Sequence, residues 1–253
     1  YLTDYALKPN DIVVVTGASG YVGSHLILQL LEKGYRVKGC VRNVDNERKN
    51  GFLKATTNPN DLTSEKFIAH FIAVPTEKDG KPYYKPLMSV LNNIAKISNK
   101  KIKVPPLVIV ESTLAPKVSD KKILPFLRKK KFQIGKNILF SVAPRRDWFI
   151  EGVKNLENLD RVYGSTDKYS AKVTKDILSI VCKKLHIASS YKISEMVKSV
   201  ENAYRHMDIT LANQLSVAFP KDNMREVLKL VGTKWNLETF HPGIGAVSYT
   251  HLT

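Results

Sequence analysis

The sequence predicts an α/β fold, with a doubly wound and mostly parallel sheet followed by one long helix. Over the first 190 residues, short apolar runs alternate with amphipathic segments of about 10 to 15 residues, the order of parallel βαβ units. Residues 194–219 then contain neither Gly nor Pro and repeat apolar residues at helical steps. We therefore expect an α/β domain over 1–190, a helical domain that starts over 191–245, and a foreign or disordered tail over 246–253.

The first unit of this pattern has the composition of a Rossmann-like, dinucleotide-binding turn. A buried strand is expected over residues 12–16 (IVVVT), a helix over 24–33 that ends before Gly34, and a second strand over 35–41. Glycines before the helix allow a tight turn and let the backbone approach a pyrophosphate, which the N–H groups of the helix N-terminus can bind. The expected cofactor-binding residues of this turn are Gly17, Ala18, Ser19, Gly20, Tyr21, Val22 and Gly23.

The residue after the second strand bears on which nicotinamide cofactor is bound. An acidic residue there accepts a hydrogen bond from the ribose 2′-hydroxyl, whereas an arginine can hold a 2′-phosphate. This chain has Arg42 followed by Asn43, which favours NADP. An ordinary surface arginine is the alternative, so the expected cofactor is NAD or NADP.

The rest of the α/β pattern follows in order. Strands are expected over residues 67–76, 107–110, 137–142, 161–164 and 186–189, and helices over 86–98, 119–130, 168–184 and 194–219. Two of these strands end in polar motifs, Val74-Pro75-Thr76 and Glu111-Ser112-Thr113. Because ligands of such sheets bind at the carboxyl ends of the strands, both motifs are expected at the ligand-binding edge.

The long helix carries a polar pair, Lys198 and Asn202. The two residues are four apart, so they project from one face of the helix, one turn after the other. An ammonium and an amide arranged in this way form a cluster of donors that can hold a developing oxyanion. A solvated lysine and a surface asparagine on a packing helix are the alternative.

Composition bounds the class of partner and the compartment. The net charge is +17, but the lysines are spread along the chain, and the densest cluster, residues 128–131, lacks interleaved aromatic pairs, so we expect no nucleic acid partner. No apolar run approaches the ~18 residues of a membrane helix, so we expect no membrane partner. Cys40 and Cys182 stand singly without metal-ligand spacing, which predicts no metal site and a cytoplasmic location.

Roughly the first fifty residues, through TGASGYVG and the VRN at 41–43, resemble the start of extended short-chain dehydrogenases/reductases. That family uses a Tyr followed four residues later by a Lys, which lowers the tyrosine pKa for proton transfer. None of the eleven tyrosines has this spacing. An NADPH-dependent reductase of this kind is therefore an alternative, as is a noncatalytic basic binding module.

A longer stretch, residues 53–245, resembles the UDP-glucose/GDP-mannose dehydrogenase family. The motifs that carry the resemblance stand in the family's order: AVPT at 73–76, ESTLAP at 111–116, RVYG at 161–164, EMVKSVENAYR at 195–205, LANQL at 211–215 and HPGIG at 241–245. The resemblance implies that the primary alcohol of a nucleotide-linked hexose is oxidised to a carboxylate by NAD(P)⁺, with an active-site Cys that traps the aldehyde. HPGIG favours UDP-N-acetylhexosamine as the substrate, with UDP-glucose as the alternative.

The resemblance also implies roles for individual residues. Lys198 and Asn202 would donate to the oxyanion, Thr113 would help to hold the attacking water, and the segment 111–113 would line the nicotinamide pocket. The family has a glutamate after the sixth strand; here that place reads PRR at 144–146, and the nearest downstream carboxylate, Glu151, would be the general base. The long helix would form a homodimer.

Three departures from the family pattern lead to further expectations. The glycine turn is of the short-chain-reductase type, so the first fifty residues are interpreted as a join to another Rossmann protein. The stretch from 42 to 53 is short, so we expect a helix to be missing there and one strand of the sheet to be at risk. After Gly245 the chain reads AVSYTHLT without a Cys, so we expect a fragment that lacks the catalytic thiol and the sugar-binding domain.

Overall fold

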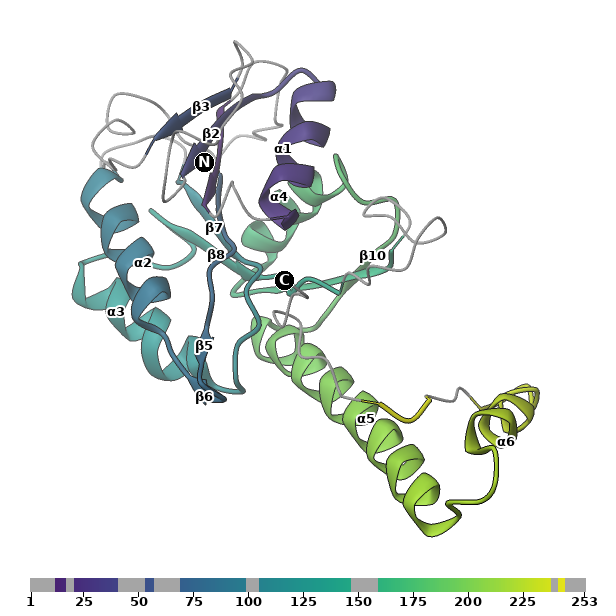
Figure 1. The fold of residues 1–253 in the computed structure, drawn as a ribbon. Coiled ribbons are helices and arrows are strands. Elements are labelled where there is room, and N and C mark those ends of the chain that lie inside the picture. Colours follow the sequence, from purple (N-terminus) through teal and green to yellow (C-terminus); the bar gives the residue numbers. More distant parts are fainter. Residues whose placement is uncertain are drawn as a thin grey trace. The chain divides into compact units, whose positions relative to one another are not determined.

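The computed structural model describes residues 12–16, 21–40, 53–56, 69–98, 105–146, 159–237 and 241–243. The chain forms two compact units, residues 1–198 and 199–253. The first unit contains an eight-stranded sheet in the order β10-β9-β8-β7-β4-β1-β2-β3 (Figure 1). Its strands are β1 (Ile12–Thr16), β2 (Arg36–Cys40), β3 (Leu53–Thr56), β4 (Ala69–Ile72), β7 (Leu107–Val110), β8 (Leu139–Val142), β9 (Arg161–Ser165) and β10 (Leu185–Ile187).

The strand order is that of a dinucleotide-binding sheet. The strands β3-β2-β1-β4-β7-β8 all pair in parallel, and the chain builds outward from β1 first on one side and then on the other. The order therefore reverses between β1 and β4, and a ligand crevice forms at such a switch point, outside the carboxyl ends of the strands. Beyond β8 the sheet is extended by β9, which is antiparallel to β8, and by β10, which is parallel to β9. The predicted Rossmann-like α/β fold is confirmed.

Helices cover both faces of this sheet (Figure 1). Apolar residues of α1 (Tyr21–Glu32) and α4 (Lys168–Leu178) belong to one core cluster, and those of α2 (Lys85–Ile97), η2 (Ser119–Ile123) and α3 (Leu124–Lys129) to another. Every described side chain of β4, β7 and β8 is buried. This is expected of parallel strands packed on both faces, and it explains their continuous apolar composition.

Side-chain hydrogen bonds are found at both ends of α4. The Asp167 carboxylate caps α4 by accepting a hydrogen bond from the Ser170 N–H at 2.8 Å. We predicted this helix to run to residue 184, but it ends at Leu178. The hydroxyl of Ser179 donates to the carbonyls of Lys175, at 2.5 Å, and Asp176, at 3.2 Å, which are among the last carbonyl groups of the helix.

Other elements differ from the prediction. The strand that we expected to be at risk is present as β3, which pairs in parallel with β2, whereas the expected loss of a helix falls on residues 41–52, outside the described residues. The predicted strand over 67–76 is described from residue 69 and ends at residue 72. A hairpin of β5 (Glu77–Lys78) and β6 (Lys81–Pro82) follows it, and the two turn residues Asp79 and Gly80 both have positive φ, as its tight turn requires.

The long helix α5 (Tyr191–Ala218) begins three residues before the predicted start, and a shorter helix, α6 (Met224–Val231), follows it. Within the second unit, Ala212, Met224 and Leu228 form a small apolar cluster. The domain boundary at residues 190/191 stays a prediction, because α5 is continuous from the first unit into the second. The tail over 246–253 lies outside the described residues. None of the helices in the described part of the chain is long and apolar enough to cross a membrane.

Candidate active site

The two polar motifs at strand ends lie beside each other. β4 and β7 are neighbouring parallel strands, with Ile72 opposite Val110 in the register. The backbone N–H groups of Glu111 and Ser112 both donate to the Ile72 carbonyl, at 2.9 and 3.2 Å. The two loops therefore leave the sheet at its carboxyl edge, next to β1, at the switch point where a dinucleotide is bound in such folds.

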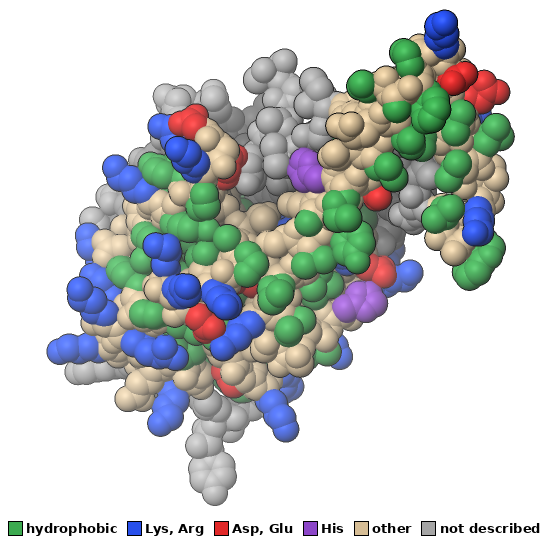
Figure 2. All heavy atoms as spheres, turned by 90° about the horizontal axis from the view of Figure 1, so that it is seen from below, with side chains coloured by type: hydrophobic (Ala, Val, Ile, Leu, Met, Phe, Trp, Pro, Cys, Tyr) green, Lys and Arg blue, Asp and Glu red, His purple; other side chains and the backbone are tan. Residues whose placement is uncertain are grey.

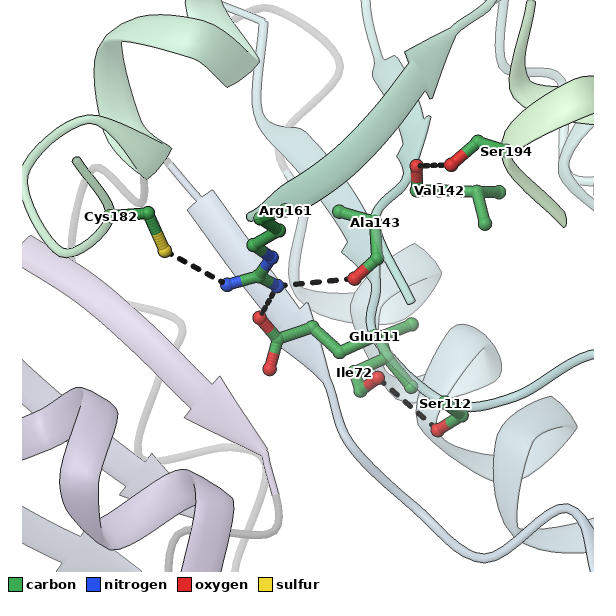
Figure 3. A network of polar contacts seen from close by, with 8 residues as sticks. All are labelled: Ile72, Glu111, Ser112, Val142, Ala143, Arg161, Cys182 and Ser194. Carbon is green, nitrogen blue, oxygen red and sulfur yellow. Dashed lines mark hydrogen bonds and ion pairs between the residues drawn. The ribbon is translucent and has the colours of Figure 1, made fainter. Parts of the chain in front are cut away.

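Two side-chain hydroxyl groups tie these loops together. Ser112 Oγ accepts a hydrogen bond from the Val74 N–H at 2.8 Å and donates to the Val74 carbonyl at 2.7 Å. It also lies 3.3 Å from the Ile72 carbonyl oxygen (Figure 3). The Thr76 hydroxyl donates to the Thr113 carbonyl at 2.5 Å. The Val74-Pro75-Thr76 and Glu111-Ser112-Thr113 loops thus form one hydrogen-bonded pair.

Exposure separates the residues of these loops into two groups. Thr76, Glu111 and Ser112 are buried, whereas Val74 and Thr113 are half-buried and Pro75 is exposed. The buried hydroxyl groups make the bonds that fix the loops. The more exposed residues are the ones that a ligand at this edge can touch.

Glu111 belongs to a buried ion pair. Arg161 Nη2, from β9, is paired with Glu111 Oε1 and also donates to the Ala143 carbonyl at 3.1 Å, while Arg161 Nη1 lies 3.9 Å from Cys182 Sγ (Figure 3). Burial lowers the pKa of Arg161, but the negative charge of Glu111 outweighs it and the pKa is raised. The carboxylate is 2% exposed and paired with Arg161, so the ion pair joins the end of β7 to the start of β9, while Arg161 also bonds to the residue after β8. Its role in lining the nicotinamide pocket stays a prediction.

The polar pair of the long helix lies on α5. Lys198 is 6% exposed, and Asn202 is half-buried. The Asn202 side-chain oxygen accepts a hydrogen bond from Arg205 Nη2 at 2.8 Å, which leaves the amide nitrogen as the group able to donate to a substrate oxygen. A lysine with a mostly buried stem at the start of a long helix has a defined position, as an oxyanion donor requires.

Several predicted site residues fall outside what the structure describes. These are Gly17, Ala18, Ser19, Gly20, Arg42 and Glu151. Tyr21, Val22 and Gly23 form the first turn of α1, without described side chains. β1 ends at Thr16 and α1 begins at Tyr21, so the glycine segment connects the central strand to a helix N-terminus, the connection that a pyrophosphate-binding turn requires.

The structure also shows residues that the sequence did not single out. Arg161 was used only as part of a strand motif, and Glu195 only as part of a helix motif, although both are buried and charged. The available signal was a charged residue inside a segment expected to be buried. Such a residue is buried only when it has a partner, so it indicates a buried polar contact. Among the described residues, no three or more His, Cys, Asp or Glu side chains are grouped so as to hold a metal ion.

The strand order, the switch point and the paired loops define a dinucleotide-binding α/β protein. Residues 38–181 match the NAD binding domain of the UDP-glucose/GDP-mannose dehydrogenase family, and residues 192–248 match the central domain of that family. The chain belongs to this family.

Curated relatives carry names from the same family. Over 264 residues the chain is 30% identical to a UDP-N-acetyl-D-mannosamine dehydrogenase of Methanococcus aeolicus, a match that covers 93% of this chain and 57% of the relative. Over 255 residues it is 29% identical to Protein CapL of Staphylococcus aureus, with 93% and 59% covered. The chain therefore spans between half and two thirds of the length of these relatives.

Solved structures share the fold. The UDP-D-ManNAc dehydrogenase of Pyrococcus horikoshii has a TM-score of 0.80 at 23% identity, over 92% of this chain and 60% of that one. The UDP-N-acetyl-mannosamine dehydrogenase Cap5O of Staphylococcus aureus has a TM-score of 0.78, also at 23% identity, over 92% and 61%. At this level of identity the likeness establishes the fold alone.

Proposed function

We propose that this chain is part of an NAD(P)-dependent nucleotide-sugar 6-dehydrogenase that converts a UDP-N-acetylhexosamine, or UDP-glucose, to the uronic acid. The observation that carries the proposal is the hydrogen-bonded pair of loops at the carboxyl ends of β4 and β7, in the same unit as the buried Lys198. Family membership supports the reaction class. The names of the curated relatives, which include UDP-N-acetyl-D-glucosamine and UDP-N-acetyl-D-mannosamine dehydrogenases, support the substrate class.

The residues divide into two groups by task. The dinucleotide, which accepts a hydride when bound, would lie with its pyrophosphate at the glycine segment 17–23 and its nicotinamide end against the loops 74–76 and 111–113. Lys198 and Asn202 would donate to the oxyanion of the sugar carbon, where fixed donors lower the barrier most. Thr113 would hold the water, and Glu151 would act as the general base.

Arg42 supports a preference for NADP over NAD within this proposal. Its guanidinium can hold a ribose 2′-phosphate, which a carboxylate at the same place would repel. Arg42→Asp should therefore reverse the preference in a titration with both dinucleotides. Equal affinities for the two cofactors before and after the exchange would contradict a role for Arg42.

A second copy of the chain is the proposed partner of the long helix, in a cytoplasmic enzyme. Large apolar side chains recur along α5 with substantial exposure, at Ile193, Met196, Val200, Tyr204, Met207 and Leu211. We call these six residues the α5 stripe. Steps of three and four residues place them along one side of the helix. Figure 2 shows exposed hydrophobic side chains among the basic ones on one face of the molecule. Stripes of this kind are typical of association surfaces.

The test is NAD(P)H formation by the full-length protein with UDP-N-acetylmannosamine, UDP-N-acetylglucosamine and UDP-glucose. Lys198→Ala and Asn202→Ala should each lower kcat by ~10²-fold or more, the usual loss of one oxyanion donor. Dinucleotide affinity should stay unchanged, and the double variant should lose less than the sum if the two donors act together. Lys229→Ala, on the exposed surface of α6, is the matched control. If Lys198→Ala turns over as the control does, α5 is only a packing element.

A further inference from the structure

We infer that Glu195 is a positioning residue that fixes the loop carrying Thr113 to the helical turn carrying Lys198. The inference rests on the proposed function and deepens it, because it names what holds two candidate catalytic groups in one arrangement. Nothing in the family motifs assigns this task to Glu195, which the sequence presents only as a helix residue.

Three donors from one short segment converge on the Glu195 carboxylate. Val118 N–H donates to Oε1 at 2.9 Å and Ser119 N–H to Oε2 at 3.0 Å, and the Ser119 hydroxyl also donates to Oε2. Glu195 is 2% exposed, and both Val118 and Ser119 are buried. Hydrogen bonds to a carboxylate are about twice as strong as neutral ones. Removing the carboxylate would leave the buried Ser119 N–H without an acceptor and the Val118 N–H with only the Ala115 carbonyl, at 3.2 Å.

The backbone that presents these donors is in a costly conformation. Lys117, immediately before Val118, has φ 74°, in the left-handed region that a non-glycine residue rarely adopts. The reversal of direction at such a residue lets successive N–H groups point into one concavity, where an anion is bound. Here the anion is a side chain from a helix 76 to 77 positions away in the sequence. The loop conformation and the placement of α5 therefore depend on each other.

The consequences reach both candidate catalytic groups. Upstream, Leu114 is buried in the apolar core, so the loop is anchored between Thr113 and the Val118–Ser119 donors. Downstream, Lys198 follows Glu195 by three residues, one turn further on the same side of α5. A change at Glu195 moves either the loop or the turn. Displacements of about 1 Å at reacting groups can cost 10²-fold in rate.

A second residue attaches the start of α5 to the sheet. Ser194, fully buried, donates its hydroxyl to the Val142 carbonyl at 2.8 Å, which ties the same helical turn to the end of β8 (Figure 3). This bond does not involve the loop that carries Thr113. Ser194→Ala therefore weakens the attachment of α5 without releasing the loop, and it serves as the matched control.

The experiment compares Glu195→Gln, Ser119→Ala and Ser194→Ala in the full-length protein. Glu195→Gln keeps the size but loses the second acceptor oxygen, and Ser119→Ala is a milder change that removes one donor. We expect Glu195→Gln to lower kcat for UDP-sugar oxidation at least tenfold and Ser119→Ala to lower it less. Ser194→Ala should keep kcat within twofold. Hydrogen exchange of residues 113–119 should accelerate in the first two variants only.

The outcomes separate this inference from the proposed function. If the wild type turns over a UDP-sugar and Glu195→Gln has the kcat and exchange rates of Ser194→Ala, the inference fails and the function stands. If the wild type oxidises no UDP-sugar, the proposed function fails. Hydrogen exchange still tests the link in that case, because unchanged protection of residues 113–119 in Glu195→Gln and Ser119→Ala contradicts it.

Discussion

The α/β unit and the helices α5 and α6 differ in which side chains are buried and which are exposed. In the α/β unit, charged groups such as Glu111 and Arg161 are buried and bonded to partners within the unit. On α5 and beyond α6, large apolar side chains are exposed, up to 93% for Trp235. Buried ionic groups with internal partners indicate a unit that is organised by its own contacts. Exposed apolar side chains in a row indicate a surface that needs a partner.

The largest effect is expected from breaking the internal ion pair of the α/β unit. Arg161→Met should lower the free energy of unfolding by about 3 to 5 kcal/mol, because it leaves the Glu111 carboxylate buried without its cation. Arg128→Met, on the exposed side of α3, is the control. Urea denaturation measures both. A loss below 1 kcal/mol for Arg161→Met would show that the pair does not organise this unit.

Low pH should lower the stability of the α/β unit because this unit contains a buried histidine. Burial of His70 in β4 lowers its pKa from 6.5 to about 4. Between these values the unfolded chain binds a proton that the folded chain does not, so the free energy of unfolding falls as the pH drops from 6.5 to 4. The difference of about 2.5 pKa units corresponds to about 3 kcal/mol. Urea denaturation at several pH values should show a shallower loss for His70→Leu, and parallel curves would contradict the assignment.

A smaller effect should follow from disturbing the attachment of α5. A Cβ at Gly164 would lie 2.2 Å from the Ser190 carbonyl oxygen and 2.9 Å from the Tyr191 nitrogen, which are backbone atoms. Gly164→Ala should therefore cost about 1 to 3 kcal/mol, as overpacking does. Gly243→Ala, with nothing within 4 Å, is the matched control and should change stability by less than about 0.5 kcal/mol. If the two variants unfold at the same temperature, the backbone at Gly164 does not lie this close to residues 190 and 191.

The smallest effect on stability is expected on the α5 stripe. Met207→Lys and Leu211→Lys alter side chains that are 68% and 59% exposed, so the unfolding of a dilute monomer should change by less than about 0.5 kcal/mol. Self-association, measured by light scattering after gel filtration, should nevertheless be lost, since a charge is buried in the proposed contact. Unchanged mass would exclude the stripe as the association surface.

The sequence predicted the elements whose signals are local. The β-branched runs of β1 and β7 and the polar motifs after β4 and β7 were found because a strand and its end are set by neighbouring residues. The hairpin β5–β6 was missed although Asp79-Gly80 is a hairpin signal, since its strands are only two residues each.

Contacts between residues that are far apart in the sequence could not be predicted from local patterns. Arg161 meets Glu111 from 50 positions away, and Glu195 meets Val118 from 77 positions away. Which strand ends become neighbours depends on the order of strands in the sheet. That order follows from packing of the whole unit and not from any single segment.

The most direct test of the central assignment is the stoichiometry of cofactor reduction. Oxidation of a primary alcohol to a carboxylate removes two hydrides, so the full-length protein should form two NAD(P)H for each UDP-sugar consumed, with the uronic acid detected by mass spectrometry. Lys198→Ala should form neither product at a comparable rate. One NAD(P)H for each sugar, or reduction without a uronic acid, would contradict the assignment.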